Sequence, residues 1–247
     1  MEEFLSFAAV LFRLHSKIIR IFAPKKNNTT MKKIMIIDGG PRKGMNTAQM
    51  LEAFAKGVAA VSENIEVKTV RLYDMQYQGC MSCMACKLKG KSSRICKFKD
   101  ELLPLLEEIS DADGLVMGSP IYMGDRTAKM QAMLERLVFP WLSYADGSIT
   151  AVKKVPTVFI YTMNATEEQA SGLVRQQTGM GEQLFQWAFG DVEIIEAYNT
   201  YQVKNYDRYE FAPNQTEMKQ AWKDAHWQED LQKAFDAGKQ MAEKVQS

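Results

Sequence analysis

The sequence predicts a doubly wound α/β fold with one parallel sheet, and three features carry that prediction. Short apolar runs rich in Ile, Val and Met recur after residue 31, as expected of strands that are covered on both faces. Segments with apolar residues at helical spacing lie between these runs. A Gly-rich turn joins the first run to the first helical segment. Because strand and helix alternate, we expect five parallel strands with helices on both faces of the sheet.

The elements follow one another in a regular order along the chain. The predicted strands cover residues 34–38, 65–72, 114–118, 155–161 and 192–197. The predicted helices cover about 46–61, 100–109, 127–137, 167–189 and 217–245. In the first helix, Met50, Phe54 and Val58 have the spacing of one buried face. In the second, Pro104 lies near the first turn, where its missing N–H matters least. The remaining segments are loops at 119–125 and 140–150 and an aromatic excursion at 201–216.

Residues 1–30 differ from the rest of the chain, because an apolar stripe at helical spacing is followed there by a polar linker. The segment starts with Glu2 and Glu3 and has no small-residue cleavage site, so it does not look like a secretory signal. Three interpretations remain: a helix docked on the domain, a helix on a membrane surface, or a natural start at Met31. We favour the start at Met31, and predict an amphipathic extension at 1–30 before one domain at 31–247.

Composition argues against several classes of protein. The chain has 247 residues and a net charge of +1, which gives no electrostatic basis for binding nucleic acid. It has no run of about eighteen apolar residues, so no transmembrane segment is expected. Its only histidines are His15 and His226, and a Ser-His-Asp or Cys-His catalytic set has little support. Four cysteines are too few for a disulfide scaffold, and we expect a cytoplasmic protein.

The Gly-rich turn has the features of an anion site. It reads GGPRKGMNT at 39–47, between the first strand and the first helix. Asn46 and Thr47 are good helix caps, and backbone N–H groups at a helix N-terminus bind phosphate. Met45-Asn46 stands in place of the Lys-Ser/Thr of a Walker A loop, and the fingerprint G-x-G-x-x-G is absent. A mononucleotide phosphate therefore fits better than ATP, and an NAD-binding sheet that uses Asp74 remains the weaker alternative.

Two stretches resemble the flavodoxin-like NADPH-dependent FMN reductases. The turn at 39–47 is similar to that family's Gly-Ser-Pro-Arg-…-Asn-Thr phosphate loop. The stretch ADGLVMGSPIYMG at 112–124 is similar to its third strand and flavin loop, and AKMQAMLERL at 128–137 to its next helix. The resemblance is good over about 31–137 and looser beyond. It implies a flavodoxin-like sheet with the strand order 2-1-3-4-5.

The resemblance also implies FMN-binding residues in three loops. The phosphate turn supplies Gly40, Pro41, Arg42, Asn46 and Thr47. The loop after the third strand supplies Pro120, Ile121, Tyr122, Met123 and Gly124, along the isoalloxazine edge. Topology adds Thr162, Met163 and Asn164 after the fourth strand. Gly40 stands where the family has serine, and Met45 where it often has Gly or Ser. Gly40 therefore offers the phosphate a backbone N–H but no hydroxyl, and we expect weaker binding, with Arg42, Asn46 and Thr47 still present.

The cysteines all lie in the loop after the second strand, with the spacing Cys80-x2-Cys83-x2-Cys86-x9-Cys96. Three cysteines at that repeat can wrap one iron–sulfur cluster. The iron–sulfur flavoprotein branch of the same family holds a [4Fe–4S] cluster on a similar motif, in which the last gap is shorter. The resemblance implies that the four cysteines are cluster ligands. Unligated thiols, zinc and a disulfide are the alternatives.

Together these motifs look like those of an FMN-dependent oxidoreductase. By the resemblance, NAD(P)H passes a hydride to flavin N5, so no catalytic side chain is needed, and electrons go on to a small acceptor such as flavin or a quinone. A homodimer or larger homo-oligomer is also implied. Two alternatives stay open: an iron–sulfur flavoprotein that transfers electrons to a redox protein, and a non-catalytic flavodoxin-fold module.

Overall fold

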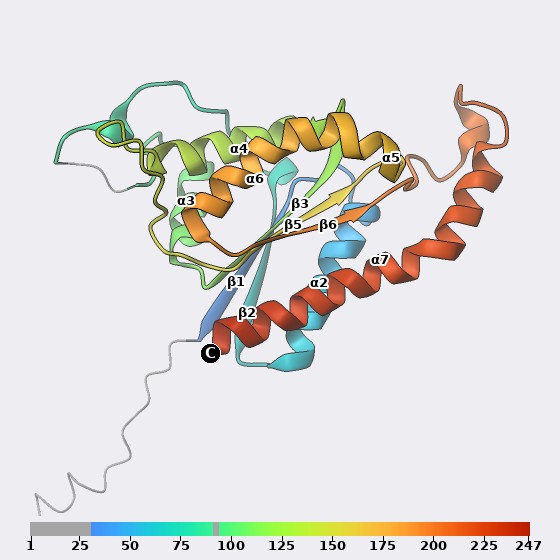
Figure 1. Cartoon of the computed structure of the whole chain (residues 1–247), viewed down its shortest axis with the longest axis horizontal. Helices are drawn as coiled ribbons and strands as arrows, with labels where there is room; N and C mark the ends of the chain where they lie inside the picture. Colours follow the sequence, from blue (N-terminus) through green and yellow to red (C-terminus); the bar gives the residue numbers. More distant parts are fainter. Residues whose placement is uncertain (1–30, 91–93) are drawn as a thin grey trace, which may run out of the picture. The chain divides into compact units, whose positions relative to one another are not determined.

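Five parallel strands form the centre of the described chain, which comprises residues 31–90 and 94–247 of this computed structural model (Figure 1). They are β1 (Lys32–Asp38), β2 (Ile65–Arg71), β3 (Gly114–Tyr122), β5 (Thr157–Thr162) and β6 (Val192–Ala197). Their order is β2-β1-β3-β5-β6. Since β5 and β6 are the fourth and fifth of the parallel strands, this confirms the predicted order 2-1-3-4-5. The extension predicted at 1–30 lies outside the described residues.

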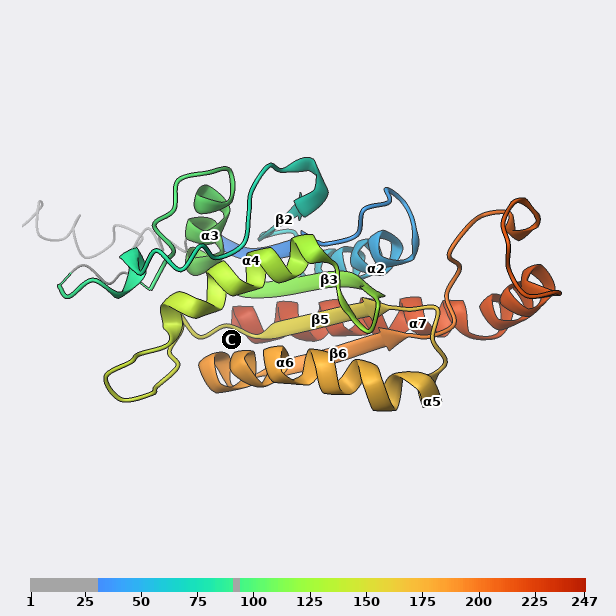
Figure 2. The ribbon, with the colours of Figure 1, turned by 90° about the horizontal axis from the view of Figure 1, so that it is seen from above.

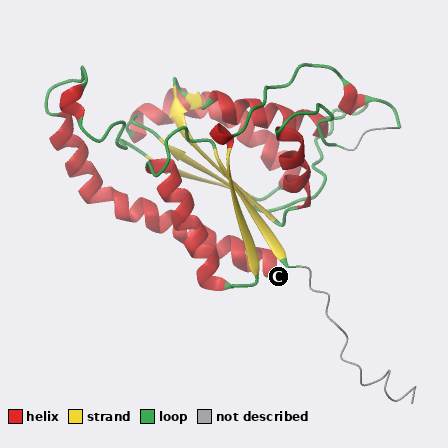
Figure 3. Cartoon of the chain, turned by 180° about the vertical axis from the view of Figure 1, so that it is seen from behind, coloured by secondary structure: helices red, strands yellow, loops and turns green. Residues whose placement is uncertain are grey.

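Helices cover both faces of this sheet (Figure 3). Strand β1 shows why: Ile34 and Ile36 belong to one buried apolar cluster, and Met35 and Ile37 to another, because successive side chains of a strand point to opposite faces. The first cluster is completed by α2 (Asn46–Val61) and α7 (Gln215–Gln246). The second is completed by α3 (Leu102–Asp111), α4 (Ala128–Val138) and α6 (Arg175–Phe189). No helix among the described residues has the length and apolar character needed to cross a membrane.

Helices α2 and α7 pack closely where they cross. A Cβ on Gly238 would lie only 2.1 Å from the carbonyl oxygen of Phe54, so glycine is required there. The first turns of α7 project beyond the end of the sheet toward which the strands point (Figure 2). The segment between β6 and α7 projects with them, and it contains a short 3₁₀ turn at Tyr206–Arg208.

The region after Gly118 differs from the sequence expectation. A loop was predicted at 119–125, but β3 continues to Tyr122 and forms a hairpin with the two-residue strand β4 (Asp125–Arg126). Ile121 pairs with Arg126 in this hairpin, and the Arg126 side chain is buried. The pairing therefore extends β3 beyond Gly118. The helix predicted at 167–189 is present as α5 (Glu167–Gln169), a π-helical turn (Ala170–Val174) and α6.

The other irregular segments contain short 3₁₀ turns. These turns cover Leu72–Asp74, Ala85–Lys87 and Phe139–Trp141. The first two belong to the long segment between β2 and α3, which carries all four cysteines.

Candidate functional site

A cavity lies at the carboxyl ends of β1, β3 and β5. The turn after β1 contributes Gly40, Pro41, Arg42, Met45, Asn46 and Thr47 to its lining. The ends of β3 and β5 contribute Pro120, Ile121, Tyr122, Thr162, Met163 and Asn164, and the segment after β6 contributes Thr200, Tyr201 and Gln202. Every residue predicted to contact FMN except Met123 and Gly124 therefore lines one cavity. Of these, Thr162, Met163 and Asn164 had been placed by topology alone.

The first turn of α2 opens onto this cavity without a capping side chain. Met45 is the N-cap residue, and within the described chain neither a side-chain cap nor an acidic residue is found at this helix start. The caps predicted from the sequence have other partners: Asn46 Nδ2 donates to the carbonyl oxygen of Tyr201 at 2.7 Å, and Thr47 Oγ1 lies 2.7 Å from Thr162 Oγ1. The free N–H groups of a helix start and the positive end of its dipole suit an anion.

A buried carboxylate, Asp38, and a partly buried guanidinium, Arg71, support the turn. Gly40 N donates to Asp38 Oδ1 at 2.7 Å, and Arg71 Nε donates to Asp38 Oδ2 at 3.1 Å. Arg71 Nη2 also reaches the Gly40 carbonyl oxygen at 3.2 Å. Burial raises the pKa of Asp38, although the bonds from Gly40 and Arg71 oppose the shift. The N–H that was expected to serve a phosphate is thus already bonded to Asp38. Sequence reasoning missed Asp38 and Arg71, which are partners in the β1–β2 register.

A segment after β6 lies over the turn, and residues 200–206 are called the strap below. Arg42 Nη1 donates to the carbonyl oxygen of Gln202, and Asn46 to that of Tyr201. Gln202 N in turn donates to the hydroxyl oxygen of Tyr206 at 2.9 Å. The cavity measures about 70 Å³, whereas small-molecule sites usually measure about 300–1,000 Å³. The strap therefore occupies part of the space beside the turn.

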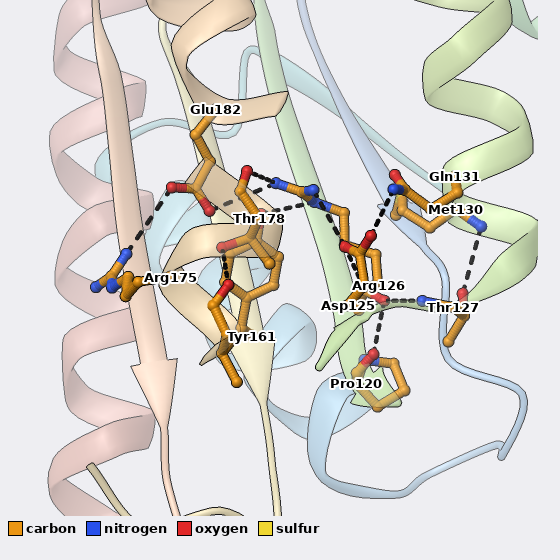
Figure 4. Close-up of polar contacts among 12 residues, drawn as sticks. Pro120, Asp125, Arg126, Thr127, Met130, Gln131, Tyr161, Arg175, Thr178 and Glu182 are labelled. Carbon is orange, nitrogen blue, oxygen red and sulfur yellow. Dashed lines mark hydrogen bonds and ion pairs between the residues drawn. The ribbon is translucent and has the colours of Figure 1, made fainter. Parts of the chain in front are cut away.

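The hairpin of β3 and β4 is anchored by one buried arginine. Arg126 Nε donates to the hydroxyl oxygen of Tyr161 at 2.9 Å, and Nη2 donates to the Thr178 carbonyl oxygen at 2.8 Å (Figure 4). Glu182 Oε1 lies 3.4 Å from the same guanidinium. Burial raises the pKa of Tyr161 well above its usual value, so the phenol stays protonated. The hairpin is thereby fixed to β5 and α6.

The tip of this hairpin points away from the cavity. Met123 has a positive φ of 52° and is 96% exposed, and Gly124 follows with a φ of 88°. This orientation explains why the two residues do not line the cavity with Pro120 and Ile121. Behind the hairpin, Thr127 Oγ1 donates to the Gly39 carbonyl oxygen at 2.8 Å and so ties it to the phosphate turn.

Residues 79–97 are called the cysteine loop, and its described parts, 79–90 and 94–97, lie along α4 away from this cavity (Figure 2). Just before the loop, the Met75 carbonyl oxygen accepts from Lys129 Nζ, at the beginning of α4, at 2.7 Å. Farther along, Lys87 Nζ donates to the Phe139 carbonyl oxygen, just after α4, at 2.6 Å. The cysteine loop and the cavity therefore lie toward opposite ends of α4.

The four cysteines line one small cavity. None of them is in a disulfide, and among the described residues no three His, Cys, Asp or Glu side chains are arranged to hold one metal ion. Ser82 and Met84 have positive φ values of 52° and 58° between the cysteines. Left-handed residues that alternate with right-handed ones form the N–H-lined nests found in many iron–sulfur sites. The donor set and the backbone thus suit a thiolate-bound cluster, provided that the sulfurs draw together.

Comparison with known proteins places these features in a family context. The family model of the NADPH-dependent FMN reductases matches residues 32–175. An iron–sulfur flavoprotein of Methanocaldococcus jannaschii is 31% identical over 104 residues, which cover 42% of this chain and 51% of that protein. An iron–sulfur flavoprotein of Archaeoglobus fulgidus is 34% identical over 104 residues, covering 42% and 48%. The chain spans about half the length of the curated relatives it matches.

Solved structures support the fold. An NAD(P)H:quinone oxidoreductase from Methanothermobacter marburgensis matches with a TM-score of 0.60 at 17% identity, covering 84% of this chain and 98% of that one. An FMN-dependent NADH-azoreductase from Bacillus anthracis also gives 0.60, at 13% identity, covering 85% and 100%. At such identities the likeness is one of fold alone, and it confirms the flavodoxin-like class.

Proposed function

Because the chain belongs to the NADPH-dependent FMN reductase family, we propose that it is an FMN-dependent oxidoreductase that takes electrons from NAD(P)H. Bound FMN supplies the redox chemistry, by accepting a hydride from the nicotinamide and passing electrons to a small acceptor such as flavin or a quinone. The chain's own residues bind the cofactor and orient it. We further place the protein in the cytoplasm as a homodimer or larger homo-oligomer.

The observation that carries this proposal is the convergence of an uncapped helix start and three strand ends on one cavity. In the proposed complex, the first N–H groups of α2 hold the FMN phosphate, together with Arg42, Asn46 and Thr47. Pro120, Ile121 and Tyr122 would lie along one side of the ring, and Thr162, Met163 and Asn164 along the other. Met123 and Gly124, at the hairpin tip outside the cavity, would have to turn inward to join them. Gly40 and Pro41 shape the turn rather than donate, since the Gly40 N–H is bonded to Asp38.

The strap has to move for this complex to form. Arg42 and Asn46 hold the carbonyl oxygens of Gln202 and Tyr201, and a phosphate would take the place of these two acceptors. Charged hydrogen bonds to a phosphate are stronger than those to a neutral carbonyl. The exchange therefore favours FMN binding and releases the strap toward solvent.

Binding measurements with two flavins test the phosphate assignment. We expect the double variant Arg42→Ala/Asn46→Ala to weaken FMN binding by roughly 10- to 100-fold, by loss of charged hydrogen bonds. Riboflavin, which has no phosphate, should bind the variant and the parent about equally. Lys43→Ala is the matched control, because its exposed ammonium pairs with Asp74 and does not line the cavity. Equal FMN affinity in the double variant and the parent would refute the assignment.

A second candidate function is electron transfer from the flavin to a protein partner through an iron–sulfur cluster. The cavity that Cys80, Cys83, Cys86 and Cys96 share favours it, as does the similarity of the chain to the two iron–sulfur flavoproteins described above. We propose these four as [4Fe–4S] ligands. Iron and sulfide analysis of protein purified without air tests the proposal, with four irons per chain as the expected result. Protein that contains no iron as purified, and that takes up no iron and sulfide on reconstitution, would remove this second function.

A further inference from the structure

Arg136, in the last turn of α4, holds both ends of the cysteine loop. Its side chain is buried, with only 1% of the residue exposed. Nη1 donates to the Gln78 carbonyl oxygen at 3.2 Å, just before the first cysteine. Nη2 donates to the Phe98 carbonyl oxygen at 3.0 Å, just after the last one. One guanidinium therefore closes a loop whose ends are far apart in sequence.

The same guanidinium contacts a cysteine directly. Arg136 Nε donates to Cys96 Sγ at 3.4 Å, within hydrogen-bond range for sulfur. Asp100 Oδ1 accepts from Nη2 at 2.9 Å and balances the buried charge. Although burial raises the pKa of Asp100, the bonds from Arg136 lower it overall, so the carboxylate is ionised. The rigid fork of arginine suits such a multiple contact, which the single ammonium of lysine cannot reproduce.

The neighbouring residue of α4 contributes to the same arrangement. Glu135 Oε2 accepts from Cys80 N at 3.0 Å, at the start of the loop. Glu135 and Arg136 thus fix the first and last cysteines from one helical turn. Cys83 and Cys86 lie between these fixed points and line the cavity with them.

From these contacts we propose that Arg136 is a positioning residue for the iron–sulfur site, one that brings Cys96 into the ligand set and donates a hydrogen bond to its sulfur. The proposal rests on the cluster proposed above. It accounts for the nine-residue gap between Cys86 and Cys96, because the clamp keeps Cys96 on the cavity that the other three cysteines line. A hydrogen bond and a positive charge beside a ligand sulfur also raise the reduction potential of a cluster.

The first test uses the full chain without iron, so it does not depend on the cluster. Cysteines of the reduced protein are alkylated with iodoacetamide, and the rate at each position is followed by mass spectrometry. In Arg136→Gln we expect Cys96 to react at least several-fold faster than in the parent, with exposed Cys80 unchanged. Arg94→Gln is the matched control, since Arg94 is an exposed cation of the same loop that bonds the Ala151 carbonyl oxygen.

The second test uses protein reconstituted with ferrous iron and sulfide. The parent should take up four irons, whereas Arg136→Gln should yield a three-iron cluster or a lower iron content, with a more negative midpoint potential. Arg136→Lys keeps the charge but not the fork, so its Cys96 should stay reactive while its potential shifts less. This milder variant also carries both tests if Arg136→Gln does not fold.

The outcomes separate the clamp from the cluster. Iron uptake by the parent together with unchanged Cys96 reactivity and potential in both Arg136 variants would overturn the positioning role. Faster alkylation of Cys96 in a variant whose parent takes up no iron would support the clamp and remove the cluster. In Cys96→Ala, adding Arg136→Gln should change iron content no further, because the two residues act through one contact. An additive loss of iron would also count against the proposal.

Discussion

The backbone N–H of Gly40 lies 2.7 Å from Asp38 Oδ1, so the turn at the end of β1 bonds to its own strand rather than leaving this donor free. A Cβ on Gly40 would lie 2.9 Å from the same carboxylate oxygen, closer than carbon and oxygen normally approach. Glycine at this position and the buried Asp38 are therefore matched to each other. The serine of related phosphate loops does not fit here without a shift of Asp38.

This match predicts that restoring the family residue is harmful. Gly40→Ser should destabilise the protein by about 1–3 kcal/mol, the usual cost of overpacking, and should not tighten FMN binding. In an Asp38→Ala background, where the obstructing oxygen is gone, the same substitution should cost much less. Urea unfolding of the four proteins, with and without FMN, measures both effects. Tighter FMN binding by the single variant would contradict the match.

The strap makes a second prediction, through the bond from Gln202 N to the Tyr206 hydroxyl oxygen. Tyr206→Phe removes that acceptor while keeping the buried ring that packs against Phe211. Losing one neutral hydrogen bond of about 0.5–1.5 kcal/mol should open the strap more often and raise the FMN association rate roughly 2- to 10-fold. Stopped-flow quenching of flavin fluorescence gives the rate.

Tyr209→Phe is the control for the strap, because Tyr209 is 56% exposed and lies just beyond residues 200–206. Its association rate should equal that of the parent. If Tyr206→Phe also binds FMN at the parental rate, the strap does not gate the cavity.

The sequence predicted the layers of this fold well, because they follow from short-range patterns. Consecutive apolar residues such as Met35 and Ile36 are needed when both faces of a strand are covered. The turn after β1 is recognisable in the sequence from its glycines. The same patterns placed the loops at the ends of β1, β3 and β5, and these loops do line one cavity.

What the sequence could not predict depends on contacts between distant residues. The residue type of Asn46 predicts a capping role, but its side-chain amide instead donates to the carbonyl oxygen of Tyr201, 155 positions away. The Ser119-Pro120 pair was read as the start of a loop, yet β3 continues because Arg126 reaches the interior beside Tyr161. No pattern in the neighbouring sequence indicates that Tyr201 bonds to Asn46 or that Arg126 bonds to Tyr161. The pairing of Asp38 with Arg71 could have been predicted from the strand register, but only once β1 and β2 were known to be neighbours.

Arg126 supports a third prediction, on stability. Removing one partner of a buried ion pair is costly, so Arg126→Met should lower the free energy of unfolding by about 3–5 kcal/mol. Tyr161→Phe loses one hydrogen bond and should cost about 1 kcal/mol. In the double variant the losses should be less than additive, because the two side chains share a bond. Arg208→Met, at an exposed site, should leave urea unfolding nearly unchanged. A cost for Arg126→Met as small as this control would contradict the anchoring role.

Lys219 supports a prediction on pH dependence. Its side chain is nearly buried, donates to Asn199 Oδ1, and has its pKa lowered by burial from 10.5 to about 8. Between these two values the unfolded chain holds a proton that the folded chain has lost. Stability therefore rises with pH across this range, because the unfolded state binds more protons. Below pH 8 both states are protonated and the folded state bears the full cost of burying the charge.

Comparison with Lys219→Met isolates this effect from every other titration. The difference in free energy of unfolding, parent minus variant, should increase by roughly 1 kcal/mol per pH unit from about pH 8 to 10.5, and stay flat below pH 7. Lys223→Met is the control, since Lys223 lies four residues after Lys219 in the same helix and is exposed. Urea unfolding at half-unit steps of pH gives the three curves. A parent-minus-Lys219→Met difference that falls or stays constant above pH 8 would show that the buried ammonium keeps its proton there.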